Sequence, residues 1–366
     1  MNDSRLGADD SVPLPLSEFG WTEDISAAFE KMAEPGDVPA RVTAVHRNRI
    51  VVATAIGEHT ATLDLRLQSS DAIERPATGD WIALHYDHAD APPRARAVVP
   101  RRTVFIRRAA GGKHAAQVVA ANIDRALIVT ALPHDVNARR LERYLAVAWE
   151  SGAMPSVVLT KCDLVADVSE YLARVREVAP GVDIIAVSAA SDDGIRELQA
   201  LIAPRSTIAL LGSSGVGKST LVNRLAAETI MRIADVDGDG RGRHTTTHRE
   251  LVRLENGMLV IDTPGMRELQ LWSAEGGLDQ AFDDITTLSE SCRFADCRHH
   301  SEPGCAVAAA LANGTLAPER VMSWRKLARE AARAQMQGDA VATSAERARL
   351  RTFMRGVRAR SREKNE

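Results

Sequence analysis

Short apolar segments separated by turn residues characterise the region between residues 38 and 106. Four of them have the length of a strand, and in the first and third of these apolar and polar positions alternate with the two-residue period of a half-buried strand. These segments are Ala40–His46, Ile50–Thr54, Thr60–Leu65 and Asp80–His85. Turns every ~8–12 residues predict a small β-barrel, which we assign to residues 38–110. A five-stranded OB-fold fits this pattern, and an SH3-like barrel fits it nearly as well.

A different pattern begins near residue 115, where longer apolar runs alternate with helical periodicity. The runs that predict buried strands are Asp124–Leu132, Val157–Leu159, Ile184–Val187, Ile208–Leu211 and Leu259–Ile261. A helix over 139–151 is predicted from apolar residues that share one helix face: Leu141, Tyr144, Leu145 and Ala148. Alternating strands and helices imply a mostly parallel sheet that is covered on both faces. We assign this domain to residues 115–285, which makes the chain a multi-domain α/β protein.

The segment after the run Ile208–Leu211 matches the phosphate-binding pattern G-x-x-x-x-G-K-[ST] at every fixed position. Glycines let backbone N–H groups converge on phosphate oxygens, and the N-terminus of the following helix adds positive partial charge. Lys218 would neutralise the β- and γ-phosphates, and the Ser219 hydroxyl would ligate Mg²⁺. A glycine-rich turn without a ligand is the alternative, but the flanking strand and helix favour a nucleotide site. The residues expected to contact the nucleotide here are Gly212, Ser213, Ser214, Gly215, Val216, Gly217, Lys218, Ser219 and Thr220.

Four residues that follow the apolar run 157–159 address which nucleotide is bound. Thr160, Lys161, Cys162 and Asp163 resemble the guanine-specificity motif N-K-x-D of GTPases, with Thr in place of the usual Asn. The Asp163 carboxylate would accept hydrogen bonds from guanine N1–H and the 2-amino group, a pair of donors that adenine lacks. Lys161 would lay its aliphatic stem along the base. The threonine leaves open which group makes the contacts of the usual asparagine to the phosphate loop.

Two further strand ends fit the same interpretation. Ser188 and Ala189 end an apolar run and are similar to the S-A motif, whose backbone contacts the guanine carbonyl oxygen. The segment Asp262–Gly265 resembles the D-x-x-G motif. There Asp262 would hold Mg²⁺ through water, and the Gly265 N–H would sense the γ-phosphate. Any one of these segments alone is an ordinary strand end, whereas together they predict a GTP site.

The order of these motifs differs from that of a standard GTPase. The guanine motif at 160–163 and the Ser-Ala pair at 188–189 precede the phosphate loop at 212–219 and the D-x-x-G segment at 262–265. This order predicts a circular permutation, which can preserve the sheet because domain termini often lie close together. As a consequence, switch II, which begins at the D-x-x-G segment, leads directly into the segment that follows the domain. A movement that depends on the γ-phosphate would therefore be transmitted to that C-terminal segment.

A cluster of potential metal ligands lies beyond this domain, within residues 286–340. Cys292, Cys297, His299 and Cys305 supply the four sulfur and nitrogen ligands of a closed tetrahedral Zn²⁺ site, which predicts a structural rather than a catalytic ion. His300 competes with His299 for the fourth position. Free surface thiols are the alternative, but exposed cysteines at this density are chemically reactive. Cys162 stands apart and is expected to be a small buried residue.

Charge is distributed unevenly, although the formal net charge is only −3. Residues 1–35 are strongly acidic, so we expect residues 1–37 to be a flexible extension. Residues 319–366 carry 13 Lys and Arg against 6 Asp and Glu, and 341–366 are expected to form an Arg-rich helical tail. This end suits a polyanionic partner, with a solvated helix face as the alternative. The barrel would add a basic edge for RNA, made of Arg47, Arg49, Arg101, Arg102, Arg107, Arg108 and Lys113.

Composition excludes several classes of protein. No stretch approaches the ~20 apolar residues that span a membrane, and the first ten residues lack the basic start and apolar core of a signal peptide. Four cysteines in 366 residues do not suggest a disulfide scaffold. We therefore expect a cytoplasmic protein without membrane contact, and a monomer is the simplest assumption.

The barrel, the permuted GTPase motifs and the Cys-Cys-His-Cys module, in this order, resemble the small ribosomal subunit biogenesis GTPase family (RsgA, also called YjeQ). The resemblance covers about residues 38–340 and includes the segments Gln117–Asp124 and Gly242–Thr247. It implies an OB-fold barrel, binding of the small ribosomal subunit and its RNA, and GTP hydrolysis that the subunit stimulates late in its maturation. The acidic leader and the Arg-rich tail lie outside the resemblance.

Residues of the hydrolysis step follow from the same resemblance. Mg²⁺ would be held by Ser219, by a threonine of 245–247 that we take to be Thr246, and through water by Asp262. The position that carries a water-orienting Gln in Ras-type enzymes is Met266, so unstimulated hydrolysis should be slow. His244 resembles the family's candidate for the missing polar group; a loop histidine without that role is the alternative. Two competing functions are an RNA-binding module with a structural nucleotide and an ATP-using enzyme, the latter disfavoured by Lys161 and Asp163.

Overall fold

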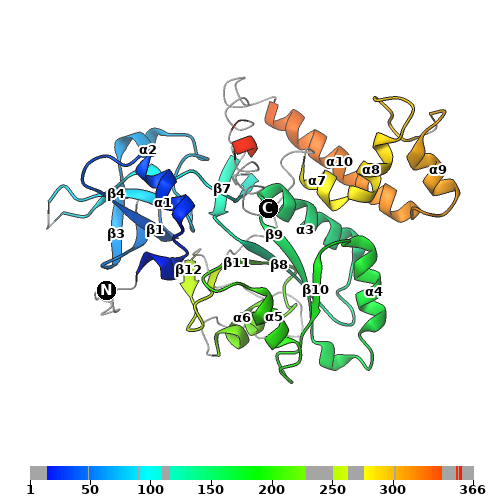
Figure 1. Ribbon diagram of the computed structural model, residues 1–366, viewed down its shortest axis with the longest axis horizontal. Helices are drawn as coiled ribbons and strands as arrows, with labels where there is room; N and C mark the ends of the chain where they lie inside the picture. The colour runs from blue at the N-terminus through cyan, green and yellow to red at the C-terminus, as the bar shows by residue number, and fades with distance from the viewer. Residues whose placement is uncertain are drawn as a thin grey trace.

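The structure is a computed structural model of the 366-residue chain. It describes residues 15–47, 49–88, 91–108, 116–227, 250–262, 276–300, 302–339, 352 and 354–356. Figure 1 shows a barrel at one end, an α/β domain in the middle and a group of helices at the other end. No helix among the described residues is both long enough and apolar enough to cross a membrane.

Strands β1 to β5 form the barrel, and their order has the connectivity of an OB-fold. β1 pairs antiparallel with both β2 and β4, β3 pairs parallel with β5, and β5 pairs antiparallel with β4, which closes the barrel. Alternating apolar residues of these strands, such as Ala40, Val42 and Ile82, fill the interior. The bounds are β1 Asp37–Val45, β2 Ile50–Thr54, β3 Gly57–Leu63, helix α2 Leu65–Ser69, β4 Trp81–His85 and β5 Arg94–Val98.

The segment before the barrel differs from the flexible extension expected over 1–37. Residues Leu16–Phe19 form the short 3-10 helix η1, and Glu23–Glu30 form helix α1. Ile25 and Phe29 of α1 are buried against Trp81 of β4, because apolar residues spaced four apart place one helix face on the barrel. Glu23, Asp24 and Glu30 of α1 are exposed on the other face, and residues 1–14 of the leader lie outside the described residues.

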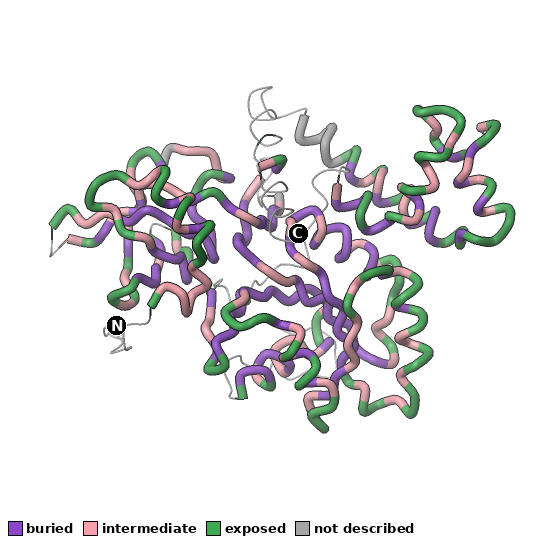
Figure 2. Tube along the Cα trace, in the orientation of Figure 1, coloured by how far each residue is buried: buried purple, intermediate pink, exposed green. Residues whose placement is uncertain are grey.

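The central domain is built on a sheet in the order β10-β9-β8-β11-β13-β12, parallel except for β12. Side chains along β8 alternate between two cores: Ala126 and Ile128 face α3, while Leu127 and Val129 face α5 and α6. Both faces are therefore buried, as the apolar runs predict, and Figure 2 shows the strands buried beneath exposed helix surfaces. The bounds are β8 Arg125–Ala131, α3 Ala138–Ser151, β9 Met154–Thr160, α4 Ser169–Val178, β10 Asp183–Ala186, α5 Ile195–Leu201, β11 Thr207–Leu211, α6 Lys218–Ala226, β12 Glu250–Arg253 and β13 Leu259–Asp262.

Barrel and central domain share one continuous sheet, because β12 pairs antiparallel with β1 at Glu250 and Ala44. Arg41 of β1 lies at this junction, where its guanidinium donates to the carbonyl of Asn122 at 3.2 Å and to the Thr207 hydroxyl at 2.8 Å. Burial lowers the pKa of Arg41 to about 10, so it stays charged at neutral pH. Nearby, the Glu18 carboxylate accepts from Arg205 and Arg253, each at 2.6 Å. These contacts fix the barrel against the strand that enters the phosphate loop.

The expected basic edge of the barrel is smaller than the charge pattern suggests. The side chain of Arg101 is 2% exposed and makes a bidentate ion pair with the buried Asp80, with N–O distances of 2.7 and 2.6 Å. Its remaining N–H groups donate to backbone carbonyls of the loop before β4, so its role is structural. Arg102 and Arg107 are half-buried, whereas Arg47 and Arg49 are exposed in the turn between β1 and β2. Sequence charge alone does not distinguish a buried ion pair from a solvent-exposed cation.

A two-stranded hairpin, β6 Val104–Arg108 and β7 Ala116–Ala121, links the barrel to the central domain. After β13 and the undescribed residues 263–275, the chain continues as α7 Gly277–Ala281, α8 Asp283–Glu290, α9 Ala306–Ala312 and α10 Pro318–Asp339. Gly277 packs so closely on α3 that a Cβ there would lie 2.4 Å from the carbonyl oxygen of Ala146. Arg320 of α10, which is buried, forms ion pairs with the buried Glu142 of α3 and the half-exposed Asp284 of α8. The C-terminal helices are thereby joined to the central domain.

Candidate functional site

The phosphate loop connects β11 to α6, as the sequence predicts. Gly212 adopts φ 150°, and a Cβ at this position would lie 2.3 Å from the carbonyl oxygen of Val129, so glycine is required there. Helix α6 begins at Lys218 and carries Ser219 and Thr220 in its first turn. The Lys218 ammonium donates to the carbonyls of Gly212 at 2.9 Å and Ser213 at 2.5 Å. The lysine is therefore folded along the loop, where a phosphate chain on the helix N-terminus would meet its charge.

Thr160, which replaces the usual Asn of the guanine motif, itself contacts the phosphate loop. Its hydroxyl donates to the carbonyl of Val216 in the phosphate loop at 2.6 Å. Thr160 is 5% exposed and Val216 is 2% exposed, so the bond is shielded from water. Lys161 adds a second link, because its ammonium donates to the carbonyl of Gly215 at 3.1 Å. The end of β9 and the phosphate loop are thus joined by two bonds, although they are more than fifty residues apart.

Asp163 and Ser188 come together from the loops after β9 and β10. The Ser188 hydroxyl donates to the Asp163 carboxylate at 2.5 Å, while its oxygen accepts the backbone N–H groups of Ala190 and Ser191 at 3.1 and 3.2 Å. This fixes the carboxylate against the Ser188–Ala189 segment. Burial, with the neighbouring Asp193 and Asp163 carboxylates, raises the pKa of the Cys162 thiol, which therefore stays neutral. Cys162 is half-buried rather than fully buried as expected.

Three of the expected site residues, His244, Thr246 and Gly265, lie outside the described residues, as does the side chain of Asp262. The backbone of Asp262 ends β13, which runs parallel to β11 in the register Ala209 to Ile261. Because carboxyl ends of parallel strands meet at one edge of a sheet, Asp262 and the phosphate loop share that edge. The ends of β9 and β10 belong to the same edge, so the permuted motifs converge despite their order in the chain.

The four expected metal ligands also come together. The ligand atoms of Cys292, Cys297, His299 and Cys305 all lie within 4.8 Å of one another. His299 Nδ1 is 3.5 Å from the sulfurs of both Cys292 and Cys305, and those sulfurs are 4.0 Å apart. A tetrahedral ion with metal–sulfur bonds of about 2.3 Å separates its ligand atoms by roughly 3.8 Å. The cluster therefore fits one metal ion, and His299 rather than the exposed His300 completes it.

Local structure explains which histidine is selected. Backbone N–H groups of Arg298 and His300 donate to the Glu302 carboxylate, at 3.0 and 2.8 Å, and turn the His299 side chain inward. Burial lowers the pKa of His299, which favours the neutral imidazole that a metal requires. Burial alone would raise the pKa of Cys292, but hydrogen bonds from backbone N–H groups at the start of α9, together with those from the Cys297 and Cys305 side chains, lower that pKa. Sequence spacing could not show these contacts, which come from the turn and the following helix.

α10 supplies further support that sequence motifs do not reveal. The indole of Trp324 lies 5.7 Å from the His299 ring, measured between ring centroids. Arg325 donates to the His299 carbonyl. These residues lie some 25 positions after His299 in an ordinary amphipathic helix, so no local signal marks them. These two contacts therefore hold the ligand loop against α10, in addition to any bonds that a metal ion would make.

Comparison with known proteins agrees with this geometry. Residues 98–272 match the family model described as RsgA GTPase. A small ribosomal subunit biogenesis GTPase RsgA of Opitutus terrae is 45% identical over 361 residues, covering 95% of this chain and 98% of that protein. The crystal structure of YjeQ from Thermotoga maritima shares the fold, with TM-score 0.62 and 24% identity over 81% of this chain and 98% of that one. YloQ, described as a circularly permuted GTPase, gives TM-score 0.59 and 22% identity over 81% and 95%. The chain belongs to the RsgA family of small ribosomal subunit biogenesis GTPases, and it is a circularly permuted GTPase.

Proposed function

We propose that this GTPase binds the small ribosomal subunit through ribosomal RNA and hydrolyses GTP in response, as a late step of subunit maturation in the cytoplasm. The observation that carries most weight is the pair of bonds from Thr160 and Lys161 to the phosphate loop, together with Ser188 bonded to Asp163. These bonds hold a guanine-reading carboxylate in fixed relation to a phosphate cradle. The name of the 45% identical relative supports the assembly role.

Nucleotide binding is assigned to residues that converge at one edge of the sheet. The guanine base would meet Asp163 and the Ser188–Ala189 backbone, with Lys161 along its face. The phosphates would meet the N–H groups of the loop 212–217 and the Lys218 ammonium. Bound Mg²⁺ would supply charge neutralisation at the phosphates. Ser219 and Thr246 would hold it directly, and Asp262 through water.

His244 is proposed to orient the attacking water. Met266 occupies the position after D-x-x-G, and a thioether is too weak an acceptor to align a water. Intrinsic turnover should therefore be slow until docking on the subunit brings a polar group to the reaction centre. His244→Ala should then abolish the stimulation by small subunits while leaving intrinsic turnover within about twofold of the unmodified enzyme.

The Cys₃His cluster is proposed to hold one structural Zn²⁺. Four protein ligands close the coordination sphere, so no position is open for a substrate or a water. The ion would fix the loop 292–305, where the polar composition cannot supply a core of its own. We propose domain boundaries at 38–110 for the barrel, 115–285 for the GTPase and 286–340 for the zinc module, with a monomer as the functional unit.

Exposed cations at both ends of the molecule are consistent with RNA as the partner. Arg47 and Arg49 project from the turn between β1 and β2. On α10, Lys326, Arg329 and Arg333 are exposed at spacings of three and four residues, which places them along one helix face. Such faces suit a phosphate backbone and make binding depend on salt.

Two measurements test the proposal. GTP turnover is followed with and without purified small subunits, and the protein is sedimented with subunits under GDP and under a non-hydrolysable GTP analogue. We expect subunits to accelerate turnover and the analogue to favour co-sedimentation. If the analogue promotes binding but turnover stays negligible with subunits, the nucleotide is structural and the protein is an RNA-binding module. Equal competition by ATP and GTP would contradict the guanine assignment itself.

A further inference from the structure

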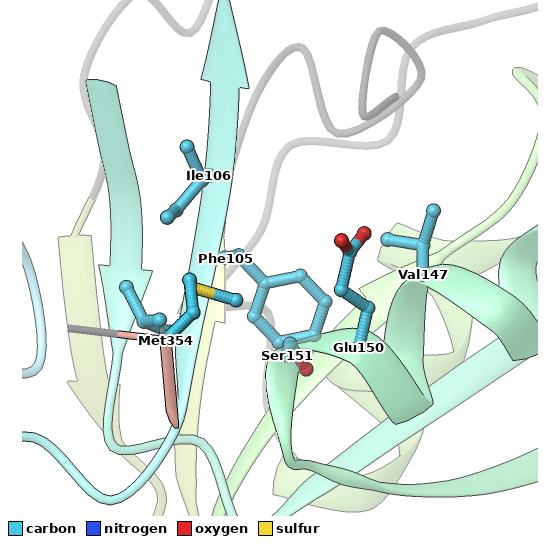
Figure 3. Close-up of a pocket in the computed structure, with 7 residues that line it drawn as sticks. Phe105, Ile106, Val147, Glu150, Ser151 and Met354 are labelled. Carbon is cyan, nitrogen blue, oxygen red and sulfur yellow. The ribbon is translucent and has the colours of Figure 1, made fainter. Parts of the chain in front are cut away.

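The groove between the hairpin β6–β7 and the end of α3 is occupied by the chain itself. Figure 3 shows the side chain of Met354 beside Phe105 of the hairpin, with Glu150 and Ser151 of α3 lining the same pocket. Met354 is 6% exposed, so its side chain fills the groove. A second contact between distant segments is polar and open to solvent. It joins the loop after β10 to the last turn of α6, beside the expected guanine site.

The loop after β10 is closed by bonds between its own residues. The Ser188 N–H donates to the carbonyl of Asp193 at 2.9 Å, and the Ser191 hydroxyl donates to the Asp193 carboxylate at 2.5 Å. Asp192 adopts φ 67°, in the left-handed region that Asp tolerates better than most side chains. The position of Asp192 is therefore linked to that of Ser188, where the backbone is expected to meet the carbonyl oxygen of the base.

Burial does not hold the tip of this loop in place. Residues 190–193 are exposed, whereas Ser188 is fully buried. The apolar core beneath the loop contains Ile195 and Leu198 of α5 together with Val222 of α6. Figure 1 shows these two helices side by side. The core fixes α5 against α6, but the exposed tip depends on polar bonds for its position relative to α6.

Arg224, in the last turn of α6, makes such a bond. Its guanidinium donates from Nε and from one terminal nitrogen to the two oxygens of the Asp192 carboxylate. This two-pronged geometry fixes the orientation of the carboxylate as well as its distance. The hydrogen bond from Arg224 lowers the pKa of Asp192, which is therefore ionised at neutral pH. Because α6 begins at Lys218 and carries Ser219, the pair joins the helix expected to receive phosphates to the loop expected to meet the base.

We propose that Arg224 is a positioning residue for guanine recognition. Through Asp192 it holds the Ser188–Ala189 backbone at the distance from the phosphate-binding helix that a guanine nucleotide requires. Arg224 would not touch the nucleotide, so its loss should weaken the contact to the base oxygen while the phosphate contacts remain. The inference rests on the proposed guanine site and deepens it, since it names a specificity-determining residue outside the guanine motifs.

Full-length variants separate this pair from a general effect on stability. Arg224→Gln removes the cation, and Asp192→Asn removes the anion but keeps a side chain that tolerates the left-handed backbone. The double variant tests whether the two residues act together. Arg224→Lys keeps the charge without the planar fork. Arg94→Gln is the matched control, because Arg94 and Asp87 form an ion pair of similar exposure on the barrel, at 2.6 Å.

Dissociation constants are measured for GDP and for 6-thio-GDP. The thio analogue keeps the N1–H and 2-amino groups that Asp163 would accept, but sulfur replaces the oxygen that the Ser188–Ala189 backbone would bind. Sulfur is a weak acceptor, so the ratio of the two constants measures this contact alone. Thermal unfolding of the same samples reports whether each variant is folded.

Arg224→Gln and Asp192→Asn should each bind GDP about two- to fivefold more weakly, as expected for an exposed ion pair. Their affinity for 6-thio-GDP should change less, so the preference for GDP falls. The double variant should be no weaker than either single variant, Arg224→Lys should lie between Arg224→Gln and the unmodified protein, and Arg94→Gln should be unchanged.

Two results would overturn the proposal. Equal weakening of GDP and 6-thio-GDP would mean that the pair does not act on the base contact, and additive losses in the double variant would mean that Arg224 and Asp192 act separately. An unmodified protein that binds ADP as tightly as GDP would contradict the guanine site itself. A preference for GDP that persists unchanged in Arg224→Gln would instead refute only the role of Arg224.

Discussion

Removing the hydroxyl of Thr160 tests how the guanine motif is connected to the phosphate loop. Thr160→Val keeps the shape of the side chain and deletes the donor that reaches the Val216 carbonyl at 2.6 Å. Both residues are at least 95% buried, so water cannot replace the missing donor without a local rearrangement.

The size of the effect follows from leaving a buried carbonyl without its partner. Such a change costs about 1–3 kcal/mol. If the cost falls on the loop conformation that receives phosphates, nucleotide affinity should fall about 5- to 150-fold, since about 1.4 kcal/mol is a factor of ten. Thr160→Asn restores a donor of the type that most GTPases use here, so its affinity should return to within about threefold of the unmodified protein.

Fluorescent GDP titration measures the dissociation constants, and thermal unfolding of the same samples checks that each variant is folded. Thr130→Val is the matched control, because Thr130 is 2% exposed on the neighbouring strand β8 and its hydroxyl bonds to Asp135 instead of the loop. We expect Thr130→Val to bind GDP normally. An affinity of Thr160→Val within twofold of the unmodified protein would refute the view that this hydroxyl couples the base site to the phosphate site.

Three other perturbations address the supporting structure. Arg320→Ala leaves Glu142 buried without its cation and should lower the free energy of unfolding by about 3–5 kcal/mol in urea; a decrease no larger than that of the exposed Arg333→Ala would contradict the ion pair with Glu142. Bonds from Arg253 and Arg205 lower the pKa of Glu18 below 4.5, so its contribution is complete above that pH and is lost as pH falls through the lowered value. The stability difference between the unmodified protein and Glu18→Gln should therefore shrink below pH 4.5, and a constant difference would refute the link. Chelation or Cys305→Ser should lower the melting temperature; a Tm that chelator does not change in the unmodified protein would exclude a structural ion.

Much of the fold and site could be predicted from the sequence, because the physical requirements are local. The phosphate loop needs glycines at fixed positions, and Gly212 does approach a neighbouring carbonyl too closely for any other residue. Helix α3 begins one residue earlier than predicted, after Asn137, whose side chain accepts the Arg140 N–H as an N-cap, and it ends at Ser151 as predicted, with Gly152 as its C-cap. The ligand spacing of the zinc module likewise brings four donor atoms together.

Long-range contacts explain what the sequence could not predict. Arg101 looks like a surface cation until the fold places Asp80 beside it in the barrel wall. The leader is acidic overall, yet Ile25 and Phe29 find an apolar partner in Trp81, more than fifty residues away. The pattern at Thr160 could not show that its hydroxyl reaches Val216, since that bond depends on the order of strands in the sheet. The composition of a segment therefore does not predict which of its side chains are buried, because burial depends on partners that are distant in the sequence.

Asp163 is expected to read guanine above the phosphate loop although it precedes that loop in the chain. Competition binding of GTP, ATP and xanthosine triphosphate to the unmodified protein and to Asp163→Asn tests this assignment most directly. An amide at this position offers a donor to the xanthine 2-oxo group in place of an acceptor for the guanine 2-amino group. We expect Asp163→Asn to lose affinity for GTP and to gain affinity for xanthosine triphosphate, while ATP stays a poor competitor for both proteins. Unchanged preference for GTP in Asp163→Asn would contradict the assignment.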